Sequence, residues 1–244
     1  MAARSTETPL SDQGALLPLD VQWCPSPNHG PRRDELRPSL VVLHYTAMNS
    51  ATEALERLCD PAAEVSAHYL IGGDGRLWQM VDESQRAWHA GAGQWAGQDD
   101  INSRSIGIEL DNAGNHPFSA PQMATLEVLL GQIMERWSIS PDGVIGHSDM
   151  APGRKIDPGP RFDWGRLSHL GLARATPPTT RQSLHDSDVP LEKLFQRYAR
   201  DLGYTARVDD AALLAAVRLR YRPWAKGLLS WEDILPLAQA DIWL

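Results

Sequence analysis

Histidine and carboxylate side chains stand at the ends of apolar segments of this 244-residue chain. His44 lies near the end of LVVLHYT, and His147 and Asp157 lie in the charged stretch 146–159, GHSDMAPGRKIDPG. Zinc hydrolases hold their metal with three ligands drawn from histidine, carboxylate and cysteine, and they leave a fourth position for water. His44, His147 and Asp157 could supply such a set, although they lack the HExxH spacing that presents two ligands on one helix. Taken one at a time, each of these residue types is more often an ordinary buried or surface side chain than a metal ligand.

The predicted strands place the candidate residues on rigid elements. Residues 40–46 are short, apolar and β-branched, which predicts a buried strand with His44 on one face. Residues 105–110, SIGIEL, predict a second strand in which Glu109 points away from the isoleucines and leucine. VSAHYLIG and RLWQMVD flank the glycine-rich turn GDG, which predicts a β-hairpin. GVIGH predicts a last short strand, from whose end the stretch 146–159 leaves as a non-helical loop.

The predicted helices complete an α/β architecture. Ser50 precedes a short amphipathic segment, ATEALERLC, and acts as its N-cap. After Ser119, apolar residues recur at helical spacing as far as Trp137, which predicts the longest helix of the chain. Strands, helices and a hairpin together predict a mixed central β-sheet flanked by helices.

Changes in composition divide the chain into four segments. Residues 1–39, rich in proline, serine and charge, predict an extended N-terminal arm. Residues 40–172 carry the strands and helices of the α/β domain. Residues 173–188 form a linker rich in proline, threonine and serine. Residues 189–244 contain three helical segments, the last of which begins at a capping box, and predict a small all-helical module.

Composition excludes several classes of partner and site. A formal net charge of −8 argues against a nucleic acid or an anionic membrane as partner, because long-range repulsion opposes both. Two cysteines leave no disulfide framework and no cysteine-based metal site, so any metal must rest on histidine and carboxylate. No signal-peptide core and no run of about 18 apolar residues occurs. The expectation is a cytoplasmic protein without a membrane span, or one of the periplasm or cell envelope if an export signal was removed; oligomeric state is left open.

Five blocks of the sequence carry a resemblance to a known family. They are VVLHYTA, VSAHYLIGGDGRLWQMV, AWHAGAGQW, N-x-x-SIGIEL and GHSDMAPGRKIDPGP. In this order and spacing the chain resembles the zinc-dependent N-acetylmuramoyl-L-alanine amidases, the family that includes AmpD, AmiD, phage amidases and animal peptidoglycan recognition proteins. The resemblance covers about residues 38–170, and it implies the fold of that family. Within the family the chain resembles AmpD and AmiD in particular, since both carry aspartate as third ligand in an RK-x-DPG setting.

The resemblance implies a role for each ionisable candidate. His44, His147 and Asp157 match the zinc ligands, Glu109 matches the catalytic acid/base, and Lys155 matches a lysine near the metal. Zinc lowers the pKa of bound water to about 7 and polarises a carbonyl, so these roles agree with amide hydrolysis. Glu109 would then move the proton, and Lys155 would stabilise the developing oxyanion. From the residues alone, Lys155 is also compatible with a solvated loop lysine.

The same resemblance implies a substrate and a cleft. Trp88, His89 and Asn102 match positions that line the cleft or contact substrate, which would be peptidoglycan or a muropeptide. Some relatives use a tyrosine where this chain has Ala67, so Glu109 must act without it. The C-terminal helices resemble, more loosely, the peptidoglycan-binding module of AmiD; a docking or oligomerisation appendage is the alternative. A non-catalytic peptidoglycan-binding or sensing protein is the alternative function.

Overall fold

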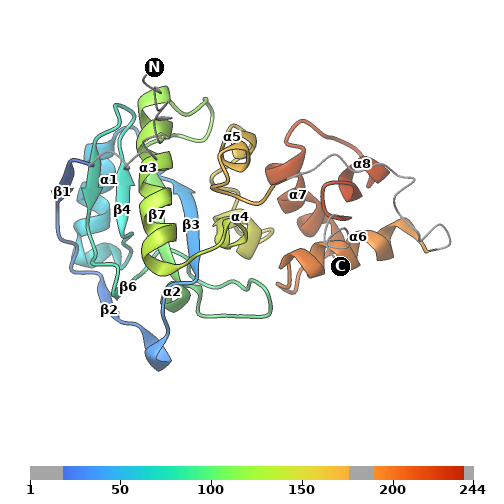
Figure 1. The fold of residues 1–244 in the computed structure, drawn as a ribbon, viewed down its shortest axis with the longest axis horizontal. Helices are drawn as coiled ribbons and strands as arrows, with labels where there is room; N and C mark the ends of the chain where they lie inside the picture. Colours follow the sequence, from blue (N-terminus) through green and yellow to red (C-terminus); the bar gives the residue numbers. More distant parts are fainter. Residues whose placement is uncertain (1–18, 176–188, 239–244) are drawn as a thin grey trace, which may run out of the picture.

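A six-stranded mixed sheet with helices on both faces forms the centre of the computed structural model, which describes residues 19–175 and 189–238 (Figure 1). Four strands, β4, β7, β3 and β8, run parallel to one another, and β5 pairs antiparallel with β4 across the expected glycine-rich turn. The mixed sheet flanked by helices confirms the predicted fold class. The order across the sheet is β1 (Val21–Trp23), β5 (Leu77–Gln79), β4 (Tyr69–Ile71), β7 (Ser105–Leu110), β3 (Leu40–Tyr45) and β8 (Val144–Gly146).

Different helices cover the two faces of the sheet. α3 (Ala120–Trp137) lies across one face, where its apolar side chains share a buried cluster with Leu43 of β3 (Figure 1). α1 (Ala51–Cys59) packs on the opposite face in a cluster with Leu70 of β4. Both helices begin directly after a serine, the predicted cap Ser50 for α1 and Ser119 for α3, whose side chains accept backbone N–H groups of the first turn. Alternation along the strands therefore sends successive residues to different helices.

Short elements complete the α/β part of the chain. They are the antiparallel pair β2 (His29–Pro31) and β6 (Gln85–Ala87), the helices α2 (Ile101–Arg104) and α5 (Trp164–His169), and the 3-10 turns η1 (Arg33–Glu35), η2 (Pro61–Ala63) and η3 (Pro141–Gly143). Among the residues described, no helix combines the length and the apolar character needed to cross a membrane.

The N-terminal segment differs from the expected arm. Within the described residues 19–39, β1 pairs parallel with β5 and β2 pairs antiparallel with β6, so the segment is built into the sheets. Each strand has three residues, too few to show periodicity, and β1 is exposed at the sheet edge. The segment is also held by Arg32, which donates hydrogen bonds to the carbonyl oxygens of Glu83, Asn102, Ser103 and Ser105.

The stretch 146–159 is not wholly the non-helical loop that its glycines and prolines predict. Its first residues form one helical turn, α4 (His147–Met150), which begins immediately after β8. The side chain of Asp149 accepts a hydrogen bond from the Gly146 N–H at 2.8 Å, and this contact closes the turn. Beyond α4 the chain continues through turns to Asp157. A polar contact inside the turn thus overrides the propensity of its flanking residues.

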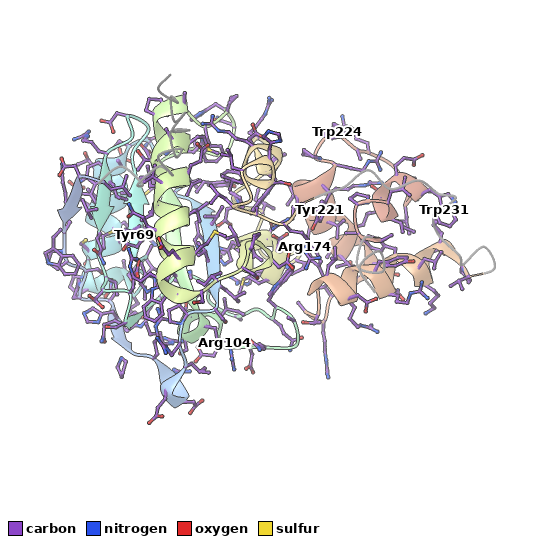
Figure 2. The ribbon with its side chains drawn as sticks, viewed as in Figure 1. Tyr69, Arg104, Arg174, Tyr221, Trp224 and Trp231 are labelled. Carbon is purple, nitrogen blue, oxygen red and sulfur yellow. The ribbon has the colours of Figure 1, made fainter. Side chains whose placement is uncertain are left out.

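The three C-terminal helices form where the sequence predicts them. They are α6 (Leu191–Leu202), α7 (Asp210–Tyr221) and α8 (Trp231–Ile234), and α8 begins at the predicted capping box. They lie beside α4 and α5 (Figure 1), and Tyr221 and Arg174 lie where the two parts of the chain meet (Figure 2). One buried cluster contains side chains from both parts, among them Val42, Ile145, Met150, Phe195, Tyr198 and Val217.

The predicted domain boundaries stay a prediction. Most of the predicted linker, residues 176–188, lies outside the described residues. At its start, Ala173 is buried in the cluster beneath α3. The continuous cluster between the sheet edge and the helices means that the two parts share a core rather than touching only at their surfaces.

Candidate active site

The candidate residues lie at the carboxyl ends of three parallel strands, β3, β7 and β8. His44 and Glu109 are register partners on β3 and β7, so their side chains lie next to each other on the same face. His147 follows directly after β8, the other neighbour of β3. Ligand sites in open α/β sheets lie outside the carboxyl ends of parallel strands. The fold thus brings together residues that are more than a hundred positions apart in the sequence.

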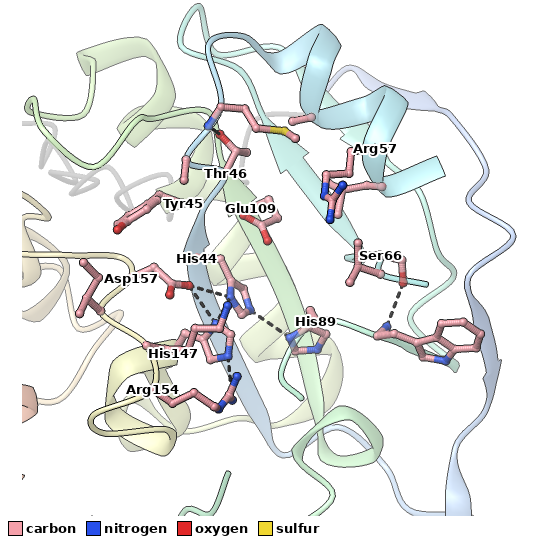
Figure 3. A pocket seen from close by; sticks show the side chains of 18 residues that line it. His44, Tyr45, Thr46, Arg57, Ser66, His89, Glu109, His147, Arg154 and Asp157 are labelled. Carbon is pink, nitrogen blue, oxygen red and sulfur yellow. Dashed lines mark hydrogen bonds and ion pairs between the residues drawn. The ribbon is translucent and has the colours of Figure 1, made fainter. Parts of the chain in front are cut away.

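His44, His147 and Asp157 form a compact cluster of possible metal ligands (Figure 3). His44 Nδ1 lies 2.9 Å from His147 Nδ1, and both nitrogens lie 3.0 Å from Asp157 Oδ2. All three residues are buried. Tetrahedral zinc with bonds of about 2.0 to 2.1 Å separates its ligand atoms by about 3.3 Å, so a small outward adjustment would accommodate the ion.

A chain of hydrogen bonds fixes the tautomer of His44. Ser105 Oγ donates to the Ile101 carbonyl oxygen at 2.6 Å, so it must accept from His89 Nε2, which lies 3.2 Å away. His89 Nδ1 is then an acceptor, and His44 Nε2, at 3.0 Å, must donate to it. This assignment leaves His44 Nδ1 without a proton and facing the other two ligand atoms.

His147 is oriented in the same way by a backbone carbonyl. Its Nε2 lies 2.9 Å from the Ala90 oxygen, which can only accept, so the proton is on Nε2 and the lone pair is on Nδ1. Arg154 Nη2 donates to the same oxygen at 2.7 Å and also to the Ala92 oxygen. Arg154 therefore joins its own loop to the segment that contains Ala90 and Ala92. Outer hydrogen bonds of this kind orient metal-binding histidines.

The cluster fits a cation. Two imidazole lone pairs and a carboxylate oxygen face one another, and none of the three atoms carries a proton to share. Burial, together with the neighbouring His147, lowers the pKa of His44 to about 4, so the ring is neutral at pH 7. Burial alone would raise the pKa of Asp157, but its close contacts with the His147 and His44 rings hold it well below its usual range. Neutral histidines and an ionised carboxylate are the donor set that divalent zinc accepts.

Glu109 lies beside this cluster and is electrostatically unlike an ordinary glutamate. Among the described residues its Oε2 is the buried side-chain atom that has no hydrogen-bond partner. Its pKa is raised to about 8, mainly by burial and in addition by the Asp157 charge, while the Lys155 charge opposes the rise. A carboxyl group with a pKa near neutrality is suited to both accepting and donating a proton.

His89 is positioned by the absence of a side chain on β7. A Cβ atom at Gly107 would lie 2.5 Å from Cγ of the His89 ring, so only glycine allows the ring to lie over the strand. The His68 ring packs edge-on against the His89 ring, with 5.8 Å between their centroids, and its Nδ1 accepts from the Gly107 N–H. The close approach of the His89 ring explains why Gly107 stands in the middle of the buried strand β7.

The cluster opens into a pocket of about 560 Å³, which is within the usual range for small-molecule sites. The predicted residues Trp88, His89, Glu109 and Lys155 line it together with the three possible ligands. Asn102 is different, because it lies behind the lining and its Oδ1 accepts from the backbone N–H groups of His89 and Ala90. Its role as a substrate contact stays a prediction, while its observed contacts support the His89 loop.

Sequence reasoning missed Ser105 as a site residue. Ser105 is the first residue of SIGIEL, and its hydroxyl completes the hydrogen bonds that orient His89 and His44. A buried polar residue at the start of an otherwise apolar strand was the available signal.

Comparison with known proteins places the chain in a family. The profile described as N-acetylmuramoyl-L-alanine amidase matches residues 34–160, more than half of the chain. The chain belongs to the N-acetylmuramoyl-L-alanine amidase family. AmiD of Escherichia coli is 34% identical over an alignment of 214 residues, gaps included, and the match covers 77% of this chain and 76% of AmiD. The 1,6-anhydro-N-acetylmuramyl-L-alanine amidase AmpD of Enterobacter cloacae is 35% identical over an alignment of 166 residues, and the match covers 61% of this chain and 89% of AmpD.

Solved structures of amidases show the same architecture. AmpDh3 from Pseudomonas aeruginosa superposes with a TM-score of 0.73 at 31% identity and covers 84% of this chain and 91% of its own. AmiD of E. coli, in complex with the substrate anhydro-N-acetylmuramic acid-L-Ala-D-γ-Glu-L-Lys, superposes with a TM-score of 0.72 at 31% identity, covering 85% and 90%. These matches span more residues than precede the C-terminal helices, so they include part of the helical module.

The raised pKa of Glu109 predicts a pH dependence of stability in the metal-free amidase. The folded-state pKa of about 8 lies above the value of about 4.3 expected on unfolding, so stability falls as pH rises from about 4.5 to 8. Glu109→Gln cannot ionise and should be more stable than the wild type at pH 8, by on the order of a few kcal/mol, yet nearly equal to it at pH 4. Urea unfolding of both metal-free proteins measures this difference, and a difference that does not change with pH would contradict the assignment.

Proposed function

We propose that this amidase hydrolyses the amide bond between the lactyl group of N-acetylmuramic acid and the L-alanine of the stem peptide, in peptidoglycan or in muropeptides. The observation that carries the proposal is the unpartnered carboxyl of Glu109 next to a buried His, His, Asp ligand set. Membership of the family supports the choice of scissile bond, since its relatives AmiD and AmpD are named for that amide.

The metal in this proposal is zinc. His44, His147 and Asp157 would hold it through two neutral imidazoles and one carboxylate, a ligand set typical of catalytic zinc. When bound, zinc lowers the pKa of a water ligand to about 7 and polarises a carbonyl group. The hydrogen bonds from His44 to His89 and from His147 to Ala90 keep both imidazoles in the tautomer that binds metal.

Glu109 is the proposed general base and general acid of the reaction. Its unpartnered Oε2 can accept a proton from water and pass it to the amide nitrogen that leaves with L-alanine. Burial favours the neutral carboxyl, while the Lys155 charge and a bound divalent cation favour the carboxylate. These opposing effects keep both the protonated and the ionised form of Glu109 accessible.

Positive side chains favour an acidic substrate. Lys155, Arg154 and Arg57 line the pocket of a chain whose formal net charge is −8, so the pocket concentrates positive charge locally. Lys155 would stabilise the negative charge that develops on the carbonyl oxygen. The free carboxylates of a stem peptide offer partners for the arginines. Trp88 and His89, which line the pocket, would contact the sugar or the peptide of the substrate.

The anhydro-muropeptide is the first substrate to test. AmiD and AmpDh3, with which this chain shares part of its helical module, are known in complex with anhydromuramic peptides. The helical module, residues 189–244, would add contacts to longer glycan, as in a peptidoglycan-binding module. Cytoplasmic recycling and envelope turnover would differ in the size of substrate that is cut.

Product analysis tests the proposed reaction. Incubation with 1,6-anhydro-muropeptide and, in parallel, with intact sacculi should release free stem peptide that begins with L-alanine. Mass spectrometry of the products identifies the bond, and the ratio of the two rates gives the substrate preference. Binding of muropeptide without cleavage in the zinc-loaded protein would support a recognition protein instead, and cleavage at another amide would overturn the choice of bond.

Replacement of Glu109 tests the proton-transfer role. Glu109→Gln should reduce kcat by about 10²- to 10⁴-fold, because it removes the acid/base while preserving volume. Zinc content should stay at the wild-type value, since Glu109 is not a ligand in this account. The matched control is Glu192→Gln on the exposed face of α6, which should leave kcat unchanged. Wild-type turnover in Glu109→Gln would show that another group moves the proton.

A further inference from the structure

The turn that carries His147 contains a buried carboxylate that the proposed chemistry does not use. Asp149 is fully buried, two residues beyond His147 on α4. Its Oδ2 accepts the Gly146 N–H and so closes the turn. A single backbone hydrogen bond does not compensate a buried negative charge, so this carboxylate requires further partners.

Those partners come from the C-terminal helical module. Arg220 of α7 donates through Nη1 to Asp149 Oδ2 at 2.7 Å, and the Tyr204 hydroxyl donates to Asp149 Oδ1 at 2.6 Å. Arg220 and Tyr204 are themselves buried. Both carboxylate oxygens of Asp149 thus accept hydrogen bonds from residues that follow the predicted linker, 55 and 71 positions away in the sequence.

Arg220 is anchored to the α/β part at two further points. Its Nη2 donates to the Val144 carbonyl oxygen of β8 at 3.2 Å, and its guanidinium carbon lies 4.0 Å from the centre of the Trp164 ring of α5. One side chain of the module therefore contacts the strand before His147, the turn that contains it and the helix that follows. A planar guanidinium can satisfy all three contacts at once.

The sequence of α7 places Arg220 on the buried face of the helix. The buried positions of the helix are Leu213, Ala216, Val217 and Arg220, a helical stripe that ends in an arginine. An arginine on the buried face of a helix requires an opposite charge inside the neighbouring part. Tyr204 is oriented as well, because its ring packs edge-on against Trp95 at 5.0 Å between centroids.

We propose that Arg220 and Tyr204 are positioning residues for the metal site. They act through Asp149, which holds the turn of α4 so that His147 Nδ1 points at His44 and Asp157. The helical module is then part of the machinery that shapes the metal site, in addition to any contact with glycan. This inference rests on the proposed zinc site and is independent of which amide is cut.

Zinc affinity, measured by chelator competition in the full-length protein, tests the proposal. Arg220→Met removes the charge and keeps an unbranched apolar side chain, and it should weaken zinc binding by about 10- to 100-fold, as loss of outer-shell support does. Tyr204→Phe removes one hydrogen bond and keeps the ring, and it should weaken zinc binding by about 3- to 10-fold. Visible absorption of the cobalt-substituted proteins should change in both variants, because the His147 geometry changes.

Arg218→Met is the matched control. Arg218 is also on α7 and forms a bidentate ion pair, with Asp233 at 2.7 and 3.0 Å, but this pair lies within the module. Its loss should lower the thermal stability of the module while leaving zinc affinity and the cobalt spectrum at their wild-type values. The comparison therefore separates a general loss of stability from a specific effect on the metal site.

The outcomes distinguish this inference from the proposed function. Wild-type zinc affinity and an unchanged cobalt spectrum in folded Tyr204→Phe and Arg220→Met would overturn the positioning role alone. If Arg220→Met does not fold, Tyr204→Phe decides the question by itself. Equal losses of affinity in Arg218→Met and Arg220→Met would also overturn it. A wild-type chain that binds no zinc would overturn both the proposed function and this inference.

Discussion

Two imidazole nitrogens and a carboxylate oxygen, each without a proton to share, face one another at 2.9 to 3.0 Å in a buried position. Electron pairs that face one another repel unless a cation lies between them, so this arrangement makes sense as a metal site. Much of the surrounding structure orients these atoms. Ser105 and His89 set the tautomer of His44, and the Ala90 carbonyl sets that of His147. The same low-dielectric surroundings raise the pKa of Glu109.

The sheet and the helical module hold the cluster from two directions. Parallel pairing of β3 with β7 and β8 puts His44 next to Glu109 and close to His147. On the far side of α4, Arg220 and Tyr204 meet the buried Asp149. The shared apolar cluster makes the module continuous with the sheet edge.

The sequence was most informative where a local pattern reports directly on structure. Apolar strands, serine caps and the hairpin turn were predictable, because propensity and burial agree there. The ligand candidates could be named from residue type, but their convergence depended on resemblance to a family, since strand order is a long-range property. The three-residue strands β1 and β2 could not be predicted, because their pairing partners lie more than fifty residues away. Arg220 was equally inaccessible, because its partner Asp149 is in another part of the chain.

Metal content coupled to activity is the most direct measurement of the central claim, that His44, His147 and Asp157 hold a zinc ion on which amide hydrolysis depends. Protein purified without chelator should contain zinc in a near-stoichiometric amount, and His44→Ala should lose it. Removal of zinc by a chelator should abolish release of the stem peptide, and added zinc should restore it. Undiminished cleavage by metal-free protein, or full zinc content in His44→Ala, would contradict the account.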